Sequence, residues 1–194
     1  MDSQRRIWLV ATGTAGCVAG CGAAAPFVGS LAPSAKARAE GGPMEVDISD
    51  VAPGEKKTVL WRGQPIWFLH RTPEMLATLK HTDSLVADPM SRGTDYPTPP
   101  WAQNRWRSIR PEMLVVVGIC THLGCSPVNR FRPGPQPSLP ADWQGGFLCP
   151  CHGSEFDLAA RVFKNMPAPA NLPVPPYRFV GKHKIVLGEA PTST

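Results

Sequence analysis

Two short boxes of sequence decide the fold: residues 120–125 read CTHLGC and residues 149–154 read CPCHGS. Each box places a thiol and an imidazole with one or two residues between them, so each can form a tight turn that presents two metal ligands. A tetrahedral zinc site would take two thiolates and two imidazoles, those of Cys120, His122, Cys149 and His152. Such a site would leave one cysteine of each box, Cys125 and Cys151, without a role. An iron–sulfur centre suits the same donor types, and both kinds of metal centre stay open at this point.

The composition indicates a loop-rich domain built on strands. The chain has 194 residues, with 23 prolines and 18 glycines, together well above the usual background of about 12%. An apolar content of 42% and six tryptophans are enough for a hydrophobic core. The net charge of +5 is spread along the chain without a basic run or an interleaved aromatic platform, which argues against nucleic acid as a partner.

Short apolar runs on both sides of the boxes predict a mainly β domain. The predicted strands cover residues 46–49, 58–61, 65–69, 113–119, 177–180 and 184–187. The run MLVVVGI over 113–119 is uninterrupted, as in a strand buried on both faces, and it leads directly into Cys120. A helix is predicted over 73–80, because Pro73 suits a first helical turn and the apolar residues share one face. Residues 83–111 predict no regular element, whereas the last two strands form a closing hairpin.

The N-terminal stretch predicts one transmembrane helix. Residues 7–32 carry no charged side chain, and a helix of that length spans about 39 Å, more than a hydrocarbon core of about 30 Å. Arg5 and Arg6 precede the run, which favours a cytoplasmic N-terminus with the rest of the chain outside. Residues 3–9 (SQRRIWL) resemble a twin-arginine export signal. Residues 33–44 are small, polar and broken by glycine and proline, so we expect a flexible linker there.

Two processing alternatives remain beside a retained anchor. Residues 37–39 (ARA) resemble a signal-peptidase site, and residues 18–21 (VAGC) resemble a lipoprotein box. We interpret Cys17 and Cys21 as small apolar residues of the helix, and the retained anchor is the favoured interpretation.

The two boxes are similar to those of Rieske proteins, and specifically to those of the iron–sulfur subunit of the cytochrome bc complex. The similarity also covers the N-terminal anchor, the linker, residues 157–176 and the closing strands. It implies a Rieske-type antiparallel β-sandwich with an inserted cluster-binding subdomain, preceded by one N-terminal transmembrane helix. The implied domains are an anchor with its export signal over residues 1–32, a hinge linker over 33–44 and a Rieske domain over 45–194. Within the Rieske domain, the base fold covers residues 45–118 and 177–190, and the cluster-binding subdomain covers 119–176.

The resemblance also implies one 2Fe–2S cluster and a role for each box residue. The implied ligands are Cys120 and Cys149 on one iron, and His122 and His152 on the other. The implied disulfide joins Cys125 to Cys151. The Ser154 hydroxyl would donate a hydrogen bond to a cluster sulfur, Leu123 would cover the cluster and contact the quinone pocket, and His152 would be the catalytic residue.

The function implied by the resemblance is electron transfer in a quinol–cytochrome c reductase. His152 would hydrogen-bond the quinol in a cytochrome b pocket and accept its proton as the cluster takes one electron, which then passes to a c-type cytochrome. The implied partners are the cytochrome b subunit, the c-type cytochrome subunit and ubiquinol, in a dimeric complex of the bacterial inner membrane. A single membrane span would hold the Rieske head in the periplasm, where a disulfide persists.

Other functions are weighed against this one. A small Rieske electron-relay subunit of a periplasmic oxidase, such as arsenite oxidase, is the alternative, although the anchor and the proline loop at residues 166–169 argue against it. A Rieske oxygenase is excluded, because the chain is too short for a second domain with a mononuclear iron. A zinc-binding module is the last alternative.

Three positions depart from the family pattern, and three histidines lie outside the boxes. Family members commonly have tyrosine, glycine and glycine at the positions of Phe156, Ala160 and Met166. Phe156 lacks the hydroxyl that would donate to a cysteine sulfur, and glycine at the other two positions would suit a positive φ. The histidines without a cysteine at ligand spacing are predicted to be structural, namely His70, His81 and His183.

Overall fold

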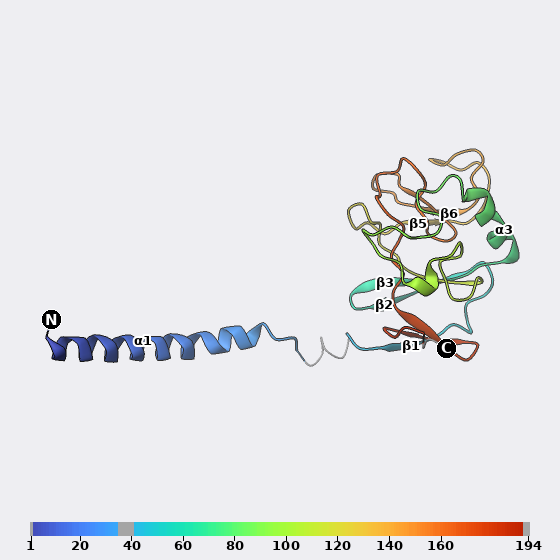
Figure 1. Ribbon diagram of the computed structural model, residues 1–194. Helices are drawn as coiled ribbons and strands as arrows, with labels where there is room; N and C mark the ends of the chain where they lie inside the picture. The colour runs from blue at the N-terminus through green and yellow to red at the C-terminus, as the bar shows by residue number, and fades with distance from the viewer. Residues whose placement is uncertain (1, 35–40, 192–194) are drawn as a thin grey trace. The chain divides into compact units, whose positions relative to one another are not determined.

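The computed structural model describes residues 2–34 and 41–191, and the chain separates into two units after Gly42. The first unit holds the helix α1 (Ser3–Ser30), which confirms the predicted N-terminal helix (Figure 1). Its 28 residues extend about 42 Å, and the helix continues through Pro26. By length and composition it is able to cross a membrane, a property that it shares with signal sequences. Residues 35–40 of the predicted hinge lie outside the described residues.

The second unit, called the head from here on, contains three antiparallel sheets of three strands each (Figure 1). The first sheet has the order β1 (Met44–Asp47), β9 (Lys184–Leu187), β8 (Tyr177–Val180). The second has the order β2 (Lys56–Trp61), β3 (Gln64–His70), β4 (Met113–Val117). The third has the order β5 (Val128–Arg130), β6 (Gly146–Leu148), β7 (Glu155–Asp157). The prediction of a mainly β, antiparallel head is therefore confirmed.

The strands of the first two sheets follow the apolar runs, but several of their ends differ from the predicted ones. The hairpin of β8 and β9 has the predicted bounds. β1 begins at Met44, the last residue of the predicted linker, because Met44 pairs with Leu187. β4 is buried at all five residues, as predicted, but ends at Val117. The next residue, Gly118, donates its backbone N–H to the carbonyl of Pro65 at 2.8 Å, outside the regular ladder.

Apolar periodicity does not predict the third sheet. Each of its strands has only three residues, which is too short for an alternation of apolar and polar residues to stand out. Its central pairs include Phe147 with Phe156. The sheet positions the boxes, because β5 follows residues 120–125 and β6 runs directly into residues 149–154.

The helix α3 (Pro73–Thr82) confirms the predicted helix and extends two residues further. The side chain of Thr72 caps it by accepting the N–H of Met75 at 3.3 Å. The segment 83–111 has no strand and only the short 3₁₀ helix η1 (Pro100–Ala102). It is nevertheless packed into the head, since Arg107 within it is fully buried.

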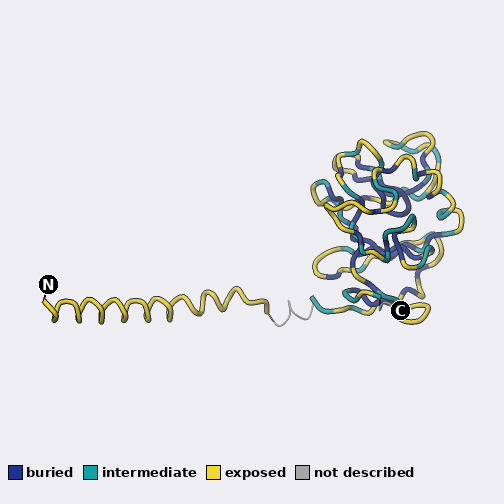
Figure 2. The backbone as a smooth tube through the Cα atoms, viewed as in Figure 1, coloured by how far each residue is buried: buried dark blue, intermediate teal, exposed yellow. Residues whose placement is uncertain are grey.

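Buried polar side chains fix the irregular segment 83–111 and the region after β7 within the head. The guanidinium of Arg107 donates to the carbonyl oxygens of Ala160 at 3.1 Å and Leu172 at 2.6 Å. The guanidinium of Arg161 lies 2.7 Å from the carboxylate of Asp157, and both side chains are almost completely buried. Figure 2 shows buried segments throughout the head, and their apolar side chains form one cluster. The base and the box region therefore share one core.

Candidate metal centre

The first box forms a closed turn that is separated from the end of β4 by two residues. The backbone N–H of Cys120 donates to the carbonyl of Cys125 at 2.7 Å, and the N–H of Gly124 donates back to the carbonyl of Cys120 at 3.1 Å. Gly124 has a φ of 83°, which a residue without a Cβ adopts easily. The turn places His122 and Leu123 at its outer end.

The second box repeats this backbone pattern directly after β6. The N–H of Cys149 donates to the carbonyl of Ser154 at 2.8 Å, and the N–H of Gly153 donates to the carbonyl of Cys149 at 3.0 Å. Gly153 has a φ of 74°. Both boxes are thus six-residue turns with the same two hydrogen bonds, although their histidines occupy different positions in the turn.

The two turns bring the four predicted ligands together. Cys120 and Cys149 are free thiols and each is only 2% exposed. The rings of His122 and His152 lie edge to face with their centroids 4.7 Å apart, and His152 is exposed whereas His122 is half-buried. Two buried thiols and two adjacent imidazoles are the donor set of a Rieske [2Fe–2S] centre, so the residues present fit this group.

The electrostatic surroundings of Cys120 suit a sulfur that binds a metal. Burial raises the pKa of the Cys120 thiol, and the neighbouring thiol of Cys149 acts in the same direction. Hydrogen bonds from the backbone N–H of His122 and from the Ser154 side chain have the opposite effect. Because a buried thiolate is costly without a cation, a bound metal would stabilise the ligating form of this side chain.

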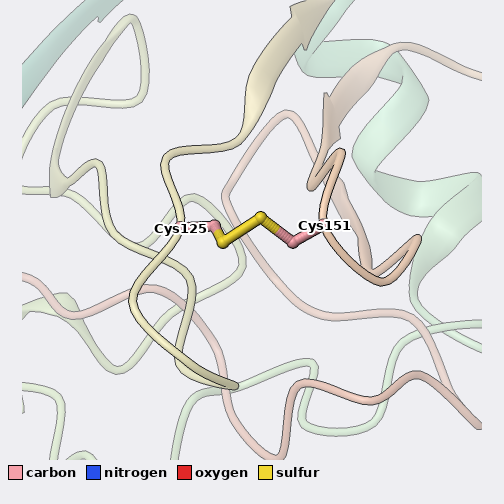
Figure 3. Close-up of a disulfide and its surroundings, with 2 residues drawn as sticks. All are labelled: Cys125 and Cys151. Carbon is pink, nitrogen blue, oxygen red and sulfur yellow. A yellow bond between two sulfur atoms is a disulfide. The ribbon is translucent and has the colours of Figure 1, made fainter.

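The predicted disulfide between Cys125 and Cys151 is confirmed (Figure 3). It joins the two turns, with a Cα–Cα distance of 6.6 Å. The sulfurs of Cys125, Cys149 and Cys151 all lie within 4.8 Å of one another. Two of these sulfurs are bonded to each other, so only Cys149 of this group can supply a thiolate.

Two hydroxyl groups fix the proline-rich segment after the boxes. The Ser154 hydroxyl oxygen accepts the backbone N–H of Ala168 at 3.0 Å and also interacts with the sulfur of Cys120. The Thr121 hydroxyl donates to the carbonyl of Ala170 at 2.6 Å. Sequence reasoning did not single out Thr121, whose only signal is its place between two predicted ligands. The predicted bond from Ser154 to a cluster sulfur stays a prediction.

The exposed end of the first turn is apolar. Leu123 is 70% exposed, and a cavity of about 460 Å³ opens beside it, lined also by His122, Tyr96 and Pro173. The role of Leu123 at a quinone pocket stays a prediction.

The departures from the family pattern have different structural consequences. Ala160 has a φ of 58°, so the expected positive φ is present there without glycine. Met166 has no positive φ, and the neighbouring Asn165 has one instead, at 62°. Phe156 is completely buried. Of the histidines outside the boxes, His70 contacts the carbonyl oxygen of Val51 at 2.8 Å.

Comparison with known proteins gives a consistent result. Residues 102–177 match the family model of the Rieske [2Fe-2S] domain. The chain is 52% identical over 186 residues to the ubiquinol-cytochrome c reductase iron-sulfur subunit of Allochromatium vinosum, covering 96% of this chain and 88% of that protein. It is 40% identical over 187 residues to the subunit of the same name from Bradyrhizobium diazoefficiens, covering 96% and 94%. A chain of a solved hyperthermophilic respiratory Complex III aligns with 25% identity and a TM-score of 0.48, covering 91% of this chain and 97% of that chain.

The fold and the donor set define a Rieske iron–sulfur protein with a [2Fe–2S] centre. Sequence identity to the subunits of Allochromatium vinosum and Bradyrhizobium diazoefficiens extends over nearly the whole chain. The chain therefore belongs to the family of the iron–sulfur subunits of ubiquinol–cytochrome c reductase. A zinc-binding module and a periplasmic oxidase relay, both considered from the sequence, are set aside by this result.

Proposed function

We propose that this chain takes one electron, together with a linked proton, from ubiquinol at a pocket of cytochrome b and passes the electron to a c-type cytochrome. The residues proposed to hold the cluster are Cys120 and Cys149 on one iron, and His122 and His152 on the other. The cluster supplies a one-electron acceptor whose potential is raised by its two neutral imidazole ligands. The observation that carries the proposal is the exposure of His152 beside two buried thiols.

His152 is the residue proposed to handle the proton. Its ring is exposed, so the nitrogen that does not bind iron can accept a hydrogen bond from a quinol hydroxyl and hold the proton. The neighbouring Leu123 is exposed as well and would provide an apolar contact in the same pocket. Cys120 and Cys149 are buried, which keeps water away from the two thiols. These roles would make His152 catalytic and Leu123 a contact residue.

The proposed location is the bacterial inner membrane, crossed once by α1, with the head in the periplasm. The family is membrane-anchored, and Arg5 and Arg6 favour a cytoplasmic N-terminus. The disulfide between Cys125 and Cys151 requires an oxidising compartment. The proposed division into an anchor over 1–32, a hinge over 33–44 and a Rieske domain over 45–194 is supported by a compact head that begins at Pro43, which includes the last two residues of the proposed hinge. We also propose that the chain assembles with cytochrome b and a c-type cytochrome in a dimeric complex.

The ligand set is tested by replacing individual residues in the full-length protein. We expect His152→Cys and Cys120→Ser to abolish or convert the Rieske signal in electron paramagnetic resonance (EPR), because each ligand determines both charge and geometry. His183→Ala is the control, since His183 is exposed and lies on the closing hairpin. A wild-type signal and wild-type quinol oxidation in either ligand variant would disprove the assignment.

A hinge function of the linker is tested separately from the cluster. Prolines introduced from Lys36 to Glu40 would stiffen the tether. We expect slower steady-state turnover of the assembled complex and an unchanged EPR signal. Unchanged turnover would show that the head does not use this segment to move between its partners.

A further inference from the structure

One buried indole touches the chain immediately before both ligand turns. Trp67 lies in the middle of β3 and is only 2% exposed. Its ring stacks on that of Phe147, with centroids 4.9 Å apart and an interplanar angle of 20°. It also lies so close to the backbone of Gly118 that an added Cβ there would be 2.1 Å from Cε2 of the indole. The indole therefore contacts one residue by ring stacking and the other by direct backbone approach.

These two contacts occupy equivalent places in the two turns. Gly118 stands two residues before Cys120, and Phe147 stands two residues before Cys149. Each is also close to the end of the strand that leads into its turn, β4 for Gly118 and β6 for Phe147. The two turns share the same hydrogen-bond pattern. A side chain that contacts both Gly118 and Phe147 therefore affects the distance between the two cysteines that follow them.

We infer that Trp67 is a positioning residue: through its contacts with Gly118 and Phe147 it sets the distance between Cys120 and Cys149. This inference rests on the proposed ligand set. The disulfide between Cys125 and Cys151 joins the turns themselves, so the indole and the disulfide constrain the pair of turns at two separate places. A close-packed interior transmits a change in one side chain to its neighbours.

The indole is itself held from several directions. Lys56 places its ammonium group 3.7 Å from the centroid of the indole ring, a cation–π contact. β3 is paired on both sides, with β2 and with β4. The backbone N–H of Gly118 is bonded to the carbonyl of Pro65, two residues before Trp67. A side chain held in this way has little freedom to adapt when the space around it changes.

The test compares Trp67→Phe, Gly118→Ala and their double variant with the wild type in the detergent-solubilised full chain. Either single change alters the fit between indole and backbone, the first by removing ring atoms and the second by adding a methyl group. We expect a changed EPR line shape, a shifted midpoint potential and about tenfold weaker retention of iron against a chelator, the lower end of the affinity loss when groups that orient metal ligands are removed. The double variant should retain iron longer than Gly118→Ala, because the smaller ring makes room for the methyl group.

Trp61→Phe is the matched control for lost volume. Trp61 lies on the neighbouring strand β2 and is 5% exposed, but its ring faces Gly188 near the C-terminal strand, at 3.0 Å from the Cβ position. We expect it to lower the unfolding temperature and to leave the EPR line shape and the potential unchanged. If Trp67→Phe behaves like Trp61→Phe, or if Gly118→Ala keeps the wild-type line shape and potential, the inference is wrong. A wild-type protein without a Rieske signal would instead overturn the proposed function.

Discussion

Removal of the disulfide is the perturbation whose effect follows most directly from the structure. Cys125→Ala and Cys151→Ala, introduced together, leave all four proposed ligands in place. The two cysteines are 26 residues apart, and in the chain-entropy model closing a loop of that length restricts the unfolded state by about 3.5 kcal/mol at 25 °C. For a head of this size, 1 kcal/mol shifts the unfolding temperature by about 2–4 °C. The double variant should therefore unfold about 7–14 °C below the wild type.

The same change should loosen the site. The disulfide sulfurs lie within 4.8 Å of the sulfur of Cys149, and the bond joins two turns that each contribute proposed ligands. Without the bond the turns are still joined by packing, by the interaction of Ser154 with Cys120 and by the pairing of β5 with β6, but they are held less tightly, so water gains access to the thiolates. We expect faster loss of iron. We also expect a lower midpoint potential, because loosened turns no longer hold their hydrogen-bond donors against the cluster sulfurs, and such donors stabilise the extra negative charge of the reduced state. Thermal unfolding followed by circular dichroism and by visible absorption measures stability and loss of the cluster on one sample, and protein-film voltammetry measures the midpoint potential.

The control uses the two other cysteines that are not proposed ligands. Cys17 and Cys21 are free and exposed on α1, so their double replacement by alanine removes two thiols without opening a loop in the head. It should leave the unfolding temperature of the head and the iron content unchanged. A Cys125→Ala/Cys151→Ala protein that unfolds within 2–3 °C of wild type and keeps its potential would refute the reasoning.

Two further predictions concern the polar and aromatic groups near the boxes. Asp157→Asn removes the nearly completely buried carboxylate that faces Arg161 and should lower the free energy of unfolding in urea by about 3–5 kcal/mol. Asp50→Asn breaks an exposed ion pair and should lower it by less than about 1 kcal/mol. Equal losses in the two variants would contradict the prediction for Asp157. Phe156→Tyr should raise the midpoint potential and Ser154→Ala should lower it, each by about 40 mV per kcal/mol of hydrogen-bond difference between the redox states. Protein-film voltammetry measures both shifts, and a Phe156→Tyr potential equal to wild type would mean that the ring points away from the sulfurs.

Short-range patterns in the sequence determined the chemistry and much of the base fold. The two boxes contain their ligand types within six residues each, and the turn of each box is closed by hydrogen bonds inside the same six residues. The strands β8 and β9 and the helix α3 likewise follow from local apolar spacing and from a proline at the first turn. These features could be predicted because the interactions that define them lie close together along the chain.

The tertiary structure decided how these pieces are related to one another. The strands β5, β6 and β7 exist only because short segments pair across the chain. The positive φ expected at Met166 is found at Asn165 instead. The burial of Arg107 within an irregular segment depends on carbonyl groups more than fifty residues away. The place of Trp67 beside Gly118 and Phe147 depends on three strands meeting. Contacts of this kind join residues that are far apart in the sequence. The local spacing of residue types does not predict them, because packing depends on the shapes of all the side chains that share the core.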